Sequence, residues 1–434
     1  NFEYKMVPSF IRYSIYIIIF YAAWIIHMTW RPILLVSFLC LLSNPKAALQ
    51  KLQLITTAIP FLLFCRDKKW KAPPYDPADA LLLASHHQTN DDTTTTTIRP
   101  VVETKTIYFV RHGESTWNDN FNKGDRPLHI FLLHWVPNLL RAVVSEWYFL
   151  VSGQETESWF FDSPLSSKGI GQAKALREFM AGVVSVPTNE DDGGGMSTDT
   201  ERDAVKVLLG GETNGVAASP TTTGSRGDGA GGGTTTTKTK SRLVSSNLRR
   251  AIVTMAVAFQ DRLDKQIPDD EICIMTDLQE ISINPDALCI TPPGADVVSS
   301  FADREITTAS SSSSSPPPVD LERIYNQQIS TKHYHRGNKE LKGNGLQRLQ
   351  NFSSAIFSSQ HGFKDVDTVI CAGHSFWFRS FFRTYIPYEV DHIAKRKKVV
   401  NGGVVGFTLS KIVVEEMDRF FIDPASIKVV YGGF

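Results

Sequence analysis

The clearest indication of the fold is the stretch TIYFVRHGES, residues 106–115, in which an apolar run leads directly into Arg111, His112 and Gly113. The run has the length and composition of a buried β-strand. In an open α/β sheet, ligands bind at the carboxyl ends of the strands. Glycine next to the histidine leaves room for an anion to approach the backbone. The stretch therefore predicts a strand that carries His112 into a binding site.

The same layout recurs far downstream, in DTVICAGHS, residues 367–375. Here a second apolar run ends in Gly373 and His374. Two histidines that each follow a strand and adjoin a glycine predict a single site, formed where the two strands end.

Four blocks of sequence resemble the motifs of the histidine phosphatase superfamily, which includes the cofactor-dependent phosphoglycerate mutases. In chain order they are RHGESTWN (111–118), SPLSSKGIGQA (163–173), SSNLRRA (245–251) and GH (373–374). They anchor residues 101–180, 241–290 and 365–410. The resemblance implies an α/β catalytic domain that transfers a phosphoryl group through a histidine.

The resemblance also implies roles for particular side chains. Neutral imidazole attacks phosphorus at physiological pH, so His112 is the expected nucleophile. Guanidinium groups bind phosphate oxygens in pairs, and the motif places Arg250, rather than Arg249, in the pocket. We expect Arg249 to face solvent or a nearby acid. The expected site comprises the catalytic residues His112, Arg111, Arg250, Glu280 and His374 and the substrate-binding residues Asn118, Gly113 and Ser115.

The expected proton donor is Glu280, because LQE at 278–280 resembles the segment that carries the acid in phosphatase members. The alternatives are that Glu280 is a solvated surface carboxylate, or that Glu114 is the acid. The scheme needs no cofactor and no metal. His333 and His335 lack a carboxylate or cysteine partner in the sequence, which argues against a metal site there.

Strand and helix patterns alternate through the blocks. Strands are expected at 107–110, 243–245, 368–372, 404–409 and 428–431, and helices at 169–180, 248–263 and after His374. Such alternation predicts an α/β three-layer sandwich with a mostly parallel central sheet and helices on both faces. Residues 101–434 would form this domain. The Gly-, Thr- and Ser-rich tracts near 181–240 and 303–318 would be disordered insertions in surface loops.

The N-terminal 71 residues are expected to form a hydrophobic membrane anchor. Residues 13–30 are almost wholly apolar, close to the ~20 residues that cross a bilayer, and further apolar runs follow at 33–43 and 52–65. The basic cluster around Lys68 favours a cytosolic position for the catalytic domain. The alternatives are a targeting sequence that is later removed and a misassigned chain start. Residues 72–100 would be a flexible linker.

A further apolar segment, 128–151, contains Pro137, Arg141 and Glu146. Two interpretations compete: a lid helix that also touches the membrane, and extra packing against the core. The two charged residues argue against a helix that spans the bilayer. Of the two, the sequence favours core packing.

Composition and residue counts argue against several classes of function. Lys plus Arg and Asp plus Glu number 45 each, so the zero net charge argues against a nucleic-acid partner. The five cysteines are scattered and predict neither a zinc site nor a disulfide framework. The expected substrate is a small phosphomonoester. Hydrolysis is favoured over mutase activity, because the "GLNERHYG"-like stretch of the family's mutases is absent where this chain reads LQEISINP, 278–285. The third possibility is a membrane-tethered binding module without turnover.

Overall fold

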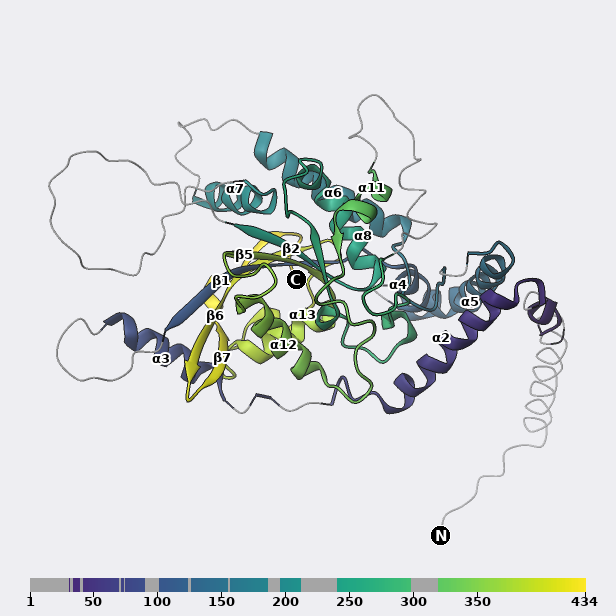
Figure 1. Ribbon diagram of the computed structural model, residues 1–434, viewed down its shortest axis with the longest axis horizontal. Coiled ribbons are helices and arrows are strands. Elements are labelled where there is room, and N and C mark those ends of the chain that lie inside the picture. The colour runs from purple at the N-terminus through teal and green to yellow at the C-terminus, as the bar shows by residue number, and fades with distance from the viewer. Residues whose placement is uncertain are drawn as a thin grey trace, which may run out of the picture.

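The computed structural model describes residues 31, 34–39, 42–69, 72–73, 75–89, 101–123, 126–154, 157–185, 196–211, 240–297 and 319–434 (Figure 1). The apolar run at 13–30 and the predicted insertion at 303–318 lie outside these residues. Within the predicted insertion at 181–240, the structure describes the end of one helix and a further helix, α7 (Met196–Leu208).

A single eight-stranded mixed sheet forms the centre of the molecule. Its strands lie in the order β4-β3-β2-β5-β1-β6-β7, and β8 also pairs with β6. The strands are β1 (Val102–Arg111), β2 (Ser241–Ser246), β3 (Ile272–Met275), β4 (Ile329–Ser330), β5 (Thr368–Gly373), β6 (Val404–Val414), β7 (Met417–Ile422) and β8 (Lys428–Tyr431). The five strands from β4 to β1 run parallel, whereas all three pairings of β6 are antiparallel.

The register of the parallel strands aligns the two histidine motifs. Phe109 lies opposite Cys371, and Arg111 lies opposite Gly373. The residue that follows each strand is a histidine, and the backbone N–H of His112 donates to the Gly373 carbonyl, 3.0 Å away. The two predicted strand ends are therefore neighbours.

Helices cover both faces of the sheet, as expected for a three-layer α/β sandwich (Figure 1). Alternate residues of β1 serve opposite faces: Tyr108 and Val110 belong to one core cluster, and Ile107 and Phe109 belong to the other. The first cluster includes residues of α6 (Ser167–Ser185), α7, α8 (Arg249–Ala258) and α11 (Leu321–Gln327). The second includes residues of α12 (Gly345–Phe357), α13 (Ser375–Tyr385) and α14 (Ile393–Arg396). The remaining short elements are α9 (Gln260–Leu263), η1 (Thr276–Leu278), η2 (Pro285–Ala287) and η3 (Pro424–Ser426).

Where the sequence predicts a flexible linker at 72–100, the structure has helix α3 (Pro77–Thr89), which packs on the outermost strand, β7. Ala80 is fully buried against Ile412 and Phe421. The Tyr75 hydroxyl lies 3.4 Å from the Phe420 carbonyl, which it can reach as a donor. This part of the chain covers an edge of the sheet that would otherwise expose unpaired backbone groups.

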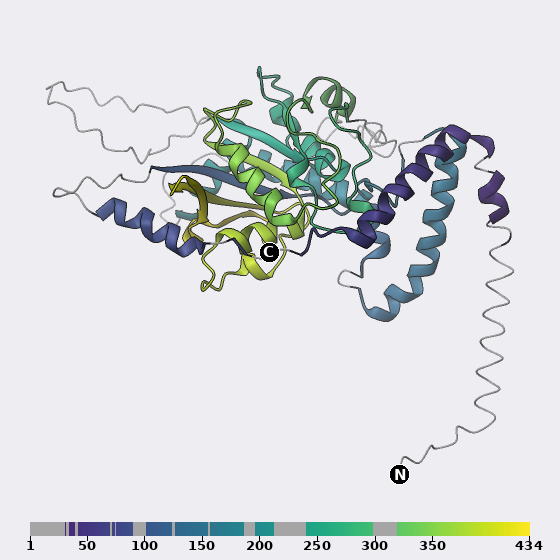
Figure 2. The same cartoon turned by 60° about the horizontal axis from the view of Figure 1, so that its bottom comes forward.

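Two long apolar helices lie side by side at one end of the molecule (Figure 2). They are α2 (Pro45–Phe64) and α5 (Leu128–Val151), and α5 follows the short helix α4 (Thr116–Phe121). Both are long and apolar enough to cross a membrane. The preference for core packing of 128–151 is wrong, because of the 24 residues of α5 only Ala142 and Leu150 are buried. Pro137 does not end the helix.

Candidate active site

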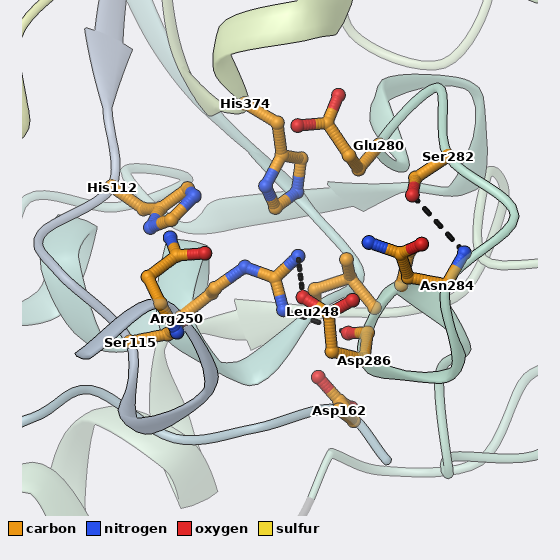
Figure 3. Close-up of polar contacts among 12 residues, drawn as sticks. His112, Ser115, Asp162, Leu248, Arg250, Glu280, Ser282, Asn284, Asp286 and His374 are labelled. Carbon is orange, nitrogen blue, oxygen red and sulfur yellow. Dashed lines mark hydrogen bonds and ion pairs between the residues drawn. The ribbon is translucent and has the colours of Figure 1, made fainter. Parts of the chain in front are cut away.

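His112 and His374 face each other at the carboxyl ends of β1 and β5, with their ring centroids 4.9 Å apart. Figure 3 shows the guanidinium group of Arg250 beneath the two imidazoles and the carboxylate of Glu280 beside His374. Four residues from four distant parts of the chain thus share one small volume.

Local contacts fix the tautomer of His112. Its Nδ1 lies 2.5 Å from the Gly113 carbonyl, which can only accept, so Nδ1 carries the proton and Nε2 keeps its lone pair. Asn401 donates to the His112 carbonyl, 3.0 Å away, and fixes the backbone. Burial, and then the charges of Arg250 and Arg111, hold the pKa of His112 well below its ordinary value. His112 is therefore neutral and can act as a nucleophile through Nε2.

His374 presents a proton donor to the same space. Its Nε2 is 2.8 Å from the Ser246 hydroxyl oxygen, which already accepts from the Leu248 N–H. When the Ser246 hydroxyl donates its hydrogen to Nε2, the ring proton of His374 is on Nδ1. Burial, followed by the charge of Arg250, lowers the pKa of His374 well below its usual value.

Of the two expected arginines, Arg250 is buried and Arg111 is half-buried, and both are only partly paired. Arg111 Nη1 donates to the Val399 carbonyl at 2.6 Å, and Arg250 Nη1 donates to the Asp286 carbonyl at 2.8 Å. Burial lowers the pKa of Arg111 to about 10, so it remains a cation at neutral pH. Burial also raises the pKa of Asp286, although the charge of Arg250 opposes the rise.

Three buried N–H donors around this space have no hydrogen-bond partner among the described residues: Nε of Arg111, Nε of Arg250 and Nδ1 of His374. A buried donor without a partner costs about 1–3 kcal/mol, so native proteins rarely leave one unused. Three of them beside a nucleophile indicate a binding site for an anion with several oxygens.

Arg249 pairs with nearby acids, which is one of the two positions expected for it from the sequence. It is buried, its Nη1 lies 3.2 Å from Glu157 Oε2, and its Nε donates to the Asp162 carbonyl at 2.9 Å. The pairing with buried acids anchors the loop before α6 to the start of α8. Figure 3 shows that Arg250 faces the histidines, whereas Arg249 is held by Glu157 and Asp162.

Glu280 is buried rather than solvated, with only 7% of its surface exposed. Its Oε1 accepts from the N–H groups of Ile281 at 2.9 Å and Trp377 at 3.1 Å, so the carboxylate lies at the first turn of α13. This contact holds the carboxyl group beside His374. The competing carboxylate, Glu114, pairs instead with Lys168 at 3.4 Å.

The three predicted substrate-binding residues have evident local roles. A Cβ atom on Gly113 would come within 2.3 Å of the Gly169 carbonyl, so this glycine permits close packing of the histidine loop on α6. The Ser115 hydroxyl accepts from the Asn118 N–H and caps α4. Asn118 Oδ1 accepts from the Asn122 amide at 2.5 Å.

A cavity of about 720 Å³ borders the site through Arg111 and Asn118. Five cations line it, against two acids. The cations are Arg111, Lys123, Arg126, Lys168 and Lys398, and the acids are Glu114 and Asp119. This excess of positive charge favours entry of an anionic ligand.

Several residues of the site have no signal in the sequence. Asp286 lies in η2, Asn401 lies in the turn before β6, and Lys339 donates to the Glu280 carbonyl from a stretch of chain without a motif. Ser246 could have been found, since it belongs to the SSNLRRA block and is the last residue of β2. His333 stacks on His361 at 4.2 Å, and the described residues contain no group of three side chains placed to hold a metal ion.

No family model matches the chain, and a search of curated proteins also finds no match. Among solved structures it is similar to a mycobacterial glucosyl-3-phosphoglycerate phosphatase in complex with VO3, with 14% identity and a TM-score of 0.28 over 74% of this chain and 98% of that one. It is also similar to phosphoserine phosphatase from Entamoeba histolytica in complex with 3-phosphoglyceric acid, with 11% identity and a TM-score of 0.24 over 73% and 94% of the two chains. Likeness at this level carries no argument about activity, which has to come from the site itself.

Proposed function

We propose that this protein is a phosphatase that hydrolyses a small phosphomonoester through a phosphohistidine on His112. The observation that carries the proposal is the set of three unpartnered buried donors, on Arg111, Arg250 and His374, beside the free Nε2 of His112. A phosphoryl group has three oxygens that need such donors and a phosphorus atom that needs such a nucleophile.

In the first step, His112 Nε2 attacks phosphorus and the bond between phosphorus and the leaving oxygen breaks. Arg111, Arg250 and His374 donate to the equatorial oxygens, where charge accumulates in the transition state. Glu280, in its protonated form, gives its proton to the leaving oxygen. The products of the step are a free alcohol and phosphorylated His112.

In the second step, water attacks the phosphorylated imidazole. The Glu280 carboxylate accepts a proton from that water, the bond between nitrogen and phosphorus breaks, and inorganic phosphate leaves. His112 returns to the neutral form, which its surroundings favour. Each enzyme group ends the cycle in its starting protonation state.

The proposal is tested by trapping the intermediate. The full chain, purified in mild detergent, is mixed with 32P-labelled p-nitrophenyl phosphate and quenched in alkali, which preserves phosphohistidine, or in acid, which hydrolyses it. We expect an acid-labile label on the parent and on His333→Asn, a matched change at an exposed histidine. We expect none on His112→Asn, with turnover reduced on the order of 10^4-fold. Equal labelling or turnover of His112→Asn would refute the assignment.

The same labelled enzyme separates hydrolysis from mutase chemistry. A phosphatase passes its label to water, and the label appears as inorganic phosphate. Transfer of the label onto an added phosphoglycerate would instead support the mutase. Absence of both labelling and turnover in the parent would support the binding module.

A further inference from the structure

Helices α2 and α5 together form an apolar arm on the catalytic domain (Figure 2). The two helices pack through Ala47, Trp147 and Leu150. Most of their large apolar side chains remain exposed, among them Leu52, Ile59 and Leu63 on α2 and Leu133, Val136 and Leu140 on α5. Contiguous exposed apolar surface of this kind marks an interaction site.

Two ordinary explanations of an apolar helix do not fit α5. A core helix is buried, yet only 6% of the apolar window of α5 is buried in the protein. A signal sequence stands near an N-terminus, whereas α5 lies between two motifs of the candidate active site. Leu133, Val136 and Leu140 follow a spacing of three and four residues, so they share one face of the helix.

Attachments to the domain show how the arm can meet a membrane. The Asn138 amide donates to the Asn120 carbonyl at 3.3 Å, and the Arg141 guanidinium lies 5.3 Å from the centre of the Trp159 ring. Glu146 accepts from the Ser158 hydroxyl at 2.7 Å. A helix held along its second half by a folded domain cannot cross a bilayer. It can only lie along the surface, with its apolar face in the interface.

The charged groups within the arm are arranged for such a position. Lys51 Nζ on α2 and Glu146 Oε2 on α5 form an ion pair of 2.8 Å between the helices. The pair neutralises the two charges and fixes the geometry of the arm before it meets lipid. Trp135 and Tyr148, partly exposed on α5, are the residue types that settle at the level of lipid headgroups.

Basic side chains surround the point where the arm joins the site. Arg126, which lines the cavity beside the candidate active site, precedes the first residue of α5 by two positions. Lys68, Arg379 and Lys398 gather around the Phe376 ring, with their cationic groups 5.6, 5.0 and 4.1 Å from its centre. Cations next to an apolar helix match the phosphates and carboxylates of anionic headgroups.

We infer that the apolar arm binds the surface of an anionic bilayer and holds the mouth of the active site at the headgroups, where it takes a phosphomonoester carried by a membrane lipid. The second half of this inference rests on the proposed function. The first half, binding of the bilayer by the arm, stands without it.

The experiment uses the full chain and two triple variants. The arm variant carries Leu133→Gln, Val136→Gln and Leu140→Gln. The control variant carries Val413→Gln, Met417→Gln and Val429→Gln, which are similarly exposed but lie on β6, β7 and β8, away from the arm. Each protein is floated with vesicles of phosphatidylcholine, with or without phosphatidylserine. Each is also assayed on soluble p-nitrophenyl phosphate and on vesicles that contain phosphatidic acid.

We expect the parent and the control to float, more strongly with phosphatidylserine, and the arm variant to bind at least about tenfold more weakly. All three should hydrolyse p-nitrophenyl phosphate alike, whereas the arm variant should lose at least about tenfold of its rate on phosphatidic acid in vesicles. Equal flotation of the arm variant and the parent would overturn the assignment of the arm, since binding would then come from another segment.

Failure of each half has its own signature. If the parent cleaves p-nitrophenyl phosphate but not phosphatidic acid in vesicles, the lipid substrate is wrong. If the parent cleaves neither substrate but the three proteins float as expected, the proposed phosphatase activity is wrong and the inference that the arm binds the bilayer is supported.

Discussion

At the candidate active site polar atoms are buried without partners, whereas on the apolar arm large apolar side chains are exposed. Arg250 and His374 are 2% and 0% exposed, yet each keeps an unused donor. Leu133 is 73% exposed on a helix with two buried residues. Buried polar groups normally have hydrogen-bond partners, and large apolar side chains are normally covered. The candidate active site is an exception to the first rule, and the apolar arm is an exception to the second.

The difference indicates what each region lacks. Unused buried donors are satisfied by a small anion, and an exposed apolar face is satisfied by lipid. A contiguous chain segment joins the two regions. Asp67, three residues after α2 ends, forms buried ion pairs with Lys339 at 2.7 Å and Arg348 at 2.6 Å, and Lys339 donates to the carbonyl of Glu280. The arm is therefore built into the catalytic domain.

After the loss of the nucleophile His112, the largest expected effect distinguishes the adjacent arginines of the site. Arg250→Ala should lower kcat/KM on the order of 10^3-fold, because it removes a phosphate donor. Arg249→Met should keep most of the activity but lose about 3 kcal/mol of stability, because it removes the buried ion pair between Arg249 and Glu157. Steady-state kinetics and urea unfolding measure the two effects. If Arg249→Met lost activity and Arg250→Ala kept it, Arg249 rather than Arg250 would bind the phosphate.

A change at Asp67, which connects the end of α2 to Lys339 and Arg348, tests whether the apolar arm and the candidate active site form one unit. Asp67→Asn leaves two buried cations without their counter-charge, so we expect a loss of about 3–5 kcal/mol in the free energy of unfolding. Turnover should also fall, since Lys339 and Arg348 hold the backbone around Glu280. Lys69→Gln, an exposed change two residues away, is the control. Indistinguishable unfolding of the two variants would mean that the arm is independent of the catalytic domain.

The proton donor is tested through the leaving group. Glu280→Gln keeps an oxygen that accepts from Ile281 and Trp377 but cannot donate an acidic proton. We expect a loss of about 10^2-fold on an alkyl phosphate, whose leaving oxygen is strongly basic. The loss on p-nitrophenyl phosphate should be much smaller. Equal losses on both substrates would show that Glu280 only caps α13.

Two glycines on α6 test the packing behind His112. A Cβ on Gly169 would lie 2.0 Å from the Glu114 carbonyl, so Gly169→Ala should destabilise the protein by about 1–3 kcal/mol. A Cβ on Gly171 meets nothing within 4 Å, so Gly171→Ala should stabilise by about 0.5–1 kcal/mol. Thermal unfolding compares them. Similar changes of Tm in the two variants would contradict the close contact between Gly169 and the Glu114 carbonyl.

The smallest effect concerns pH. The folded protein keeps His112 neutral well below pH 6.5, whereas the unfolded chain takes up a proton near that value. Burial of His112 therefore costs stability as pH falls, by about 1 kcal/mol between pH 6.5 and 5.5. His112→Asn should show a correspondingly weaker fall in its free energy of unfolding than His333→Asn. In steady-state kinetics, after correction for the ionisation of the substrate, kcat/KM should begin to fall only below pH 6.5.

Local sequence was enough for the parts of the fold that depend on neighbouring residues. The strand before His112, the strand before His374 and the helix from Ser167 follow from periodicity and composition. β3, β4 and β7 escaped detection because they are two to six residues long and carry no motif. The preference for packing of 128–151 failed because composition states how apolar a helix is, but not which other segments are present to cover it.

The sequence by itself determined which chemical groups stand at the ends of two strands, because a motif fixes residue types over a few positions. It could not determine their surroundings, such as the Asp286 carbonyl on Arg250 or the Ser246 hydroxyl on His374. Those contacts join segments 36 and 128 residues apart. Only the parallel register of β1, β5 and β2 brings such segments together, and with them the buried donors that need an anion. Likewise, only the tertiary structure determines that α5 is held by the domain from Asn138 onward and that its apolar side chains lie exposed.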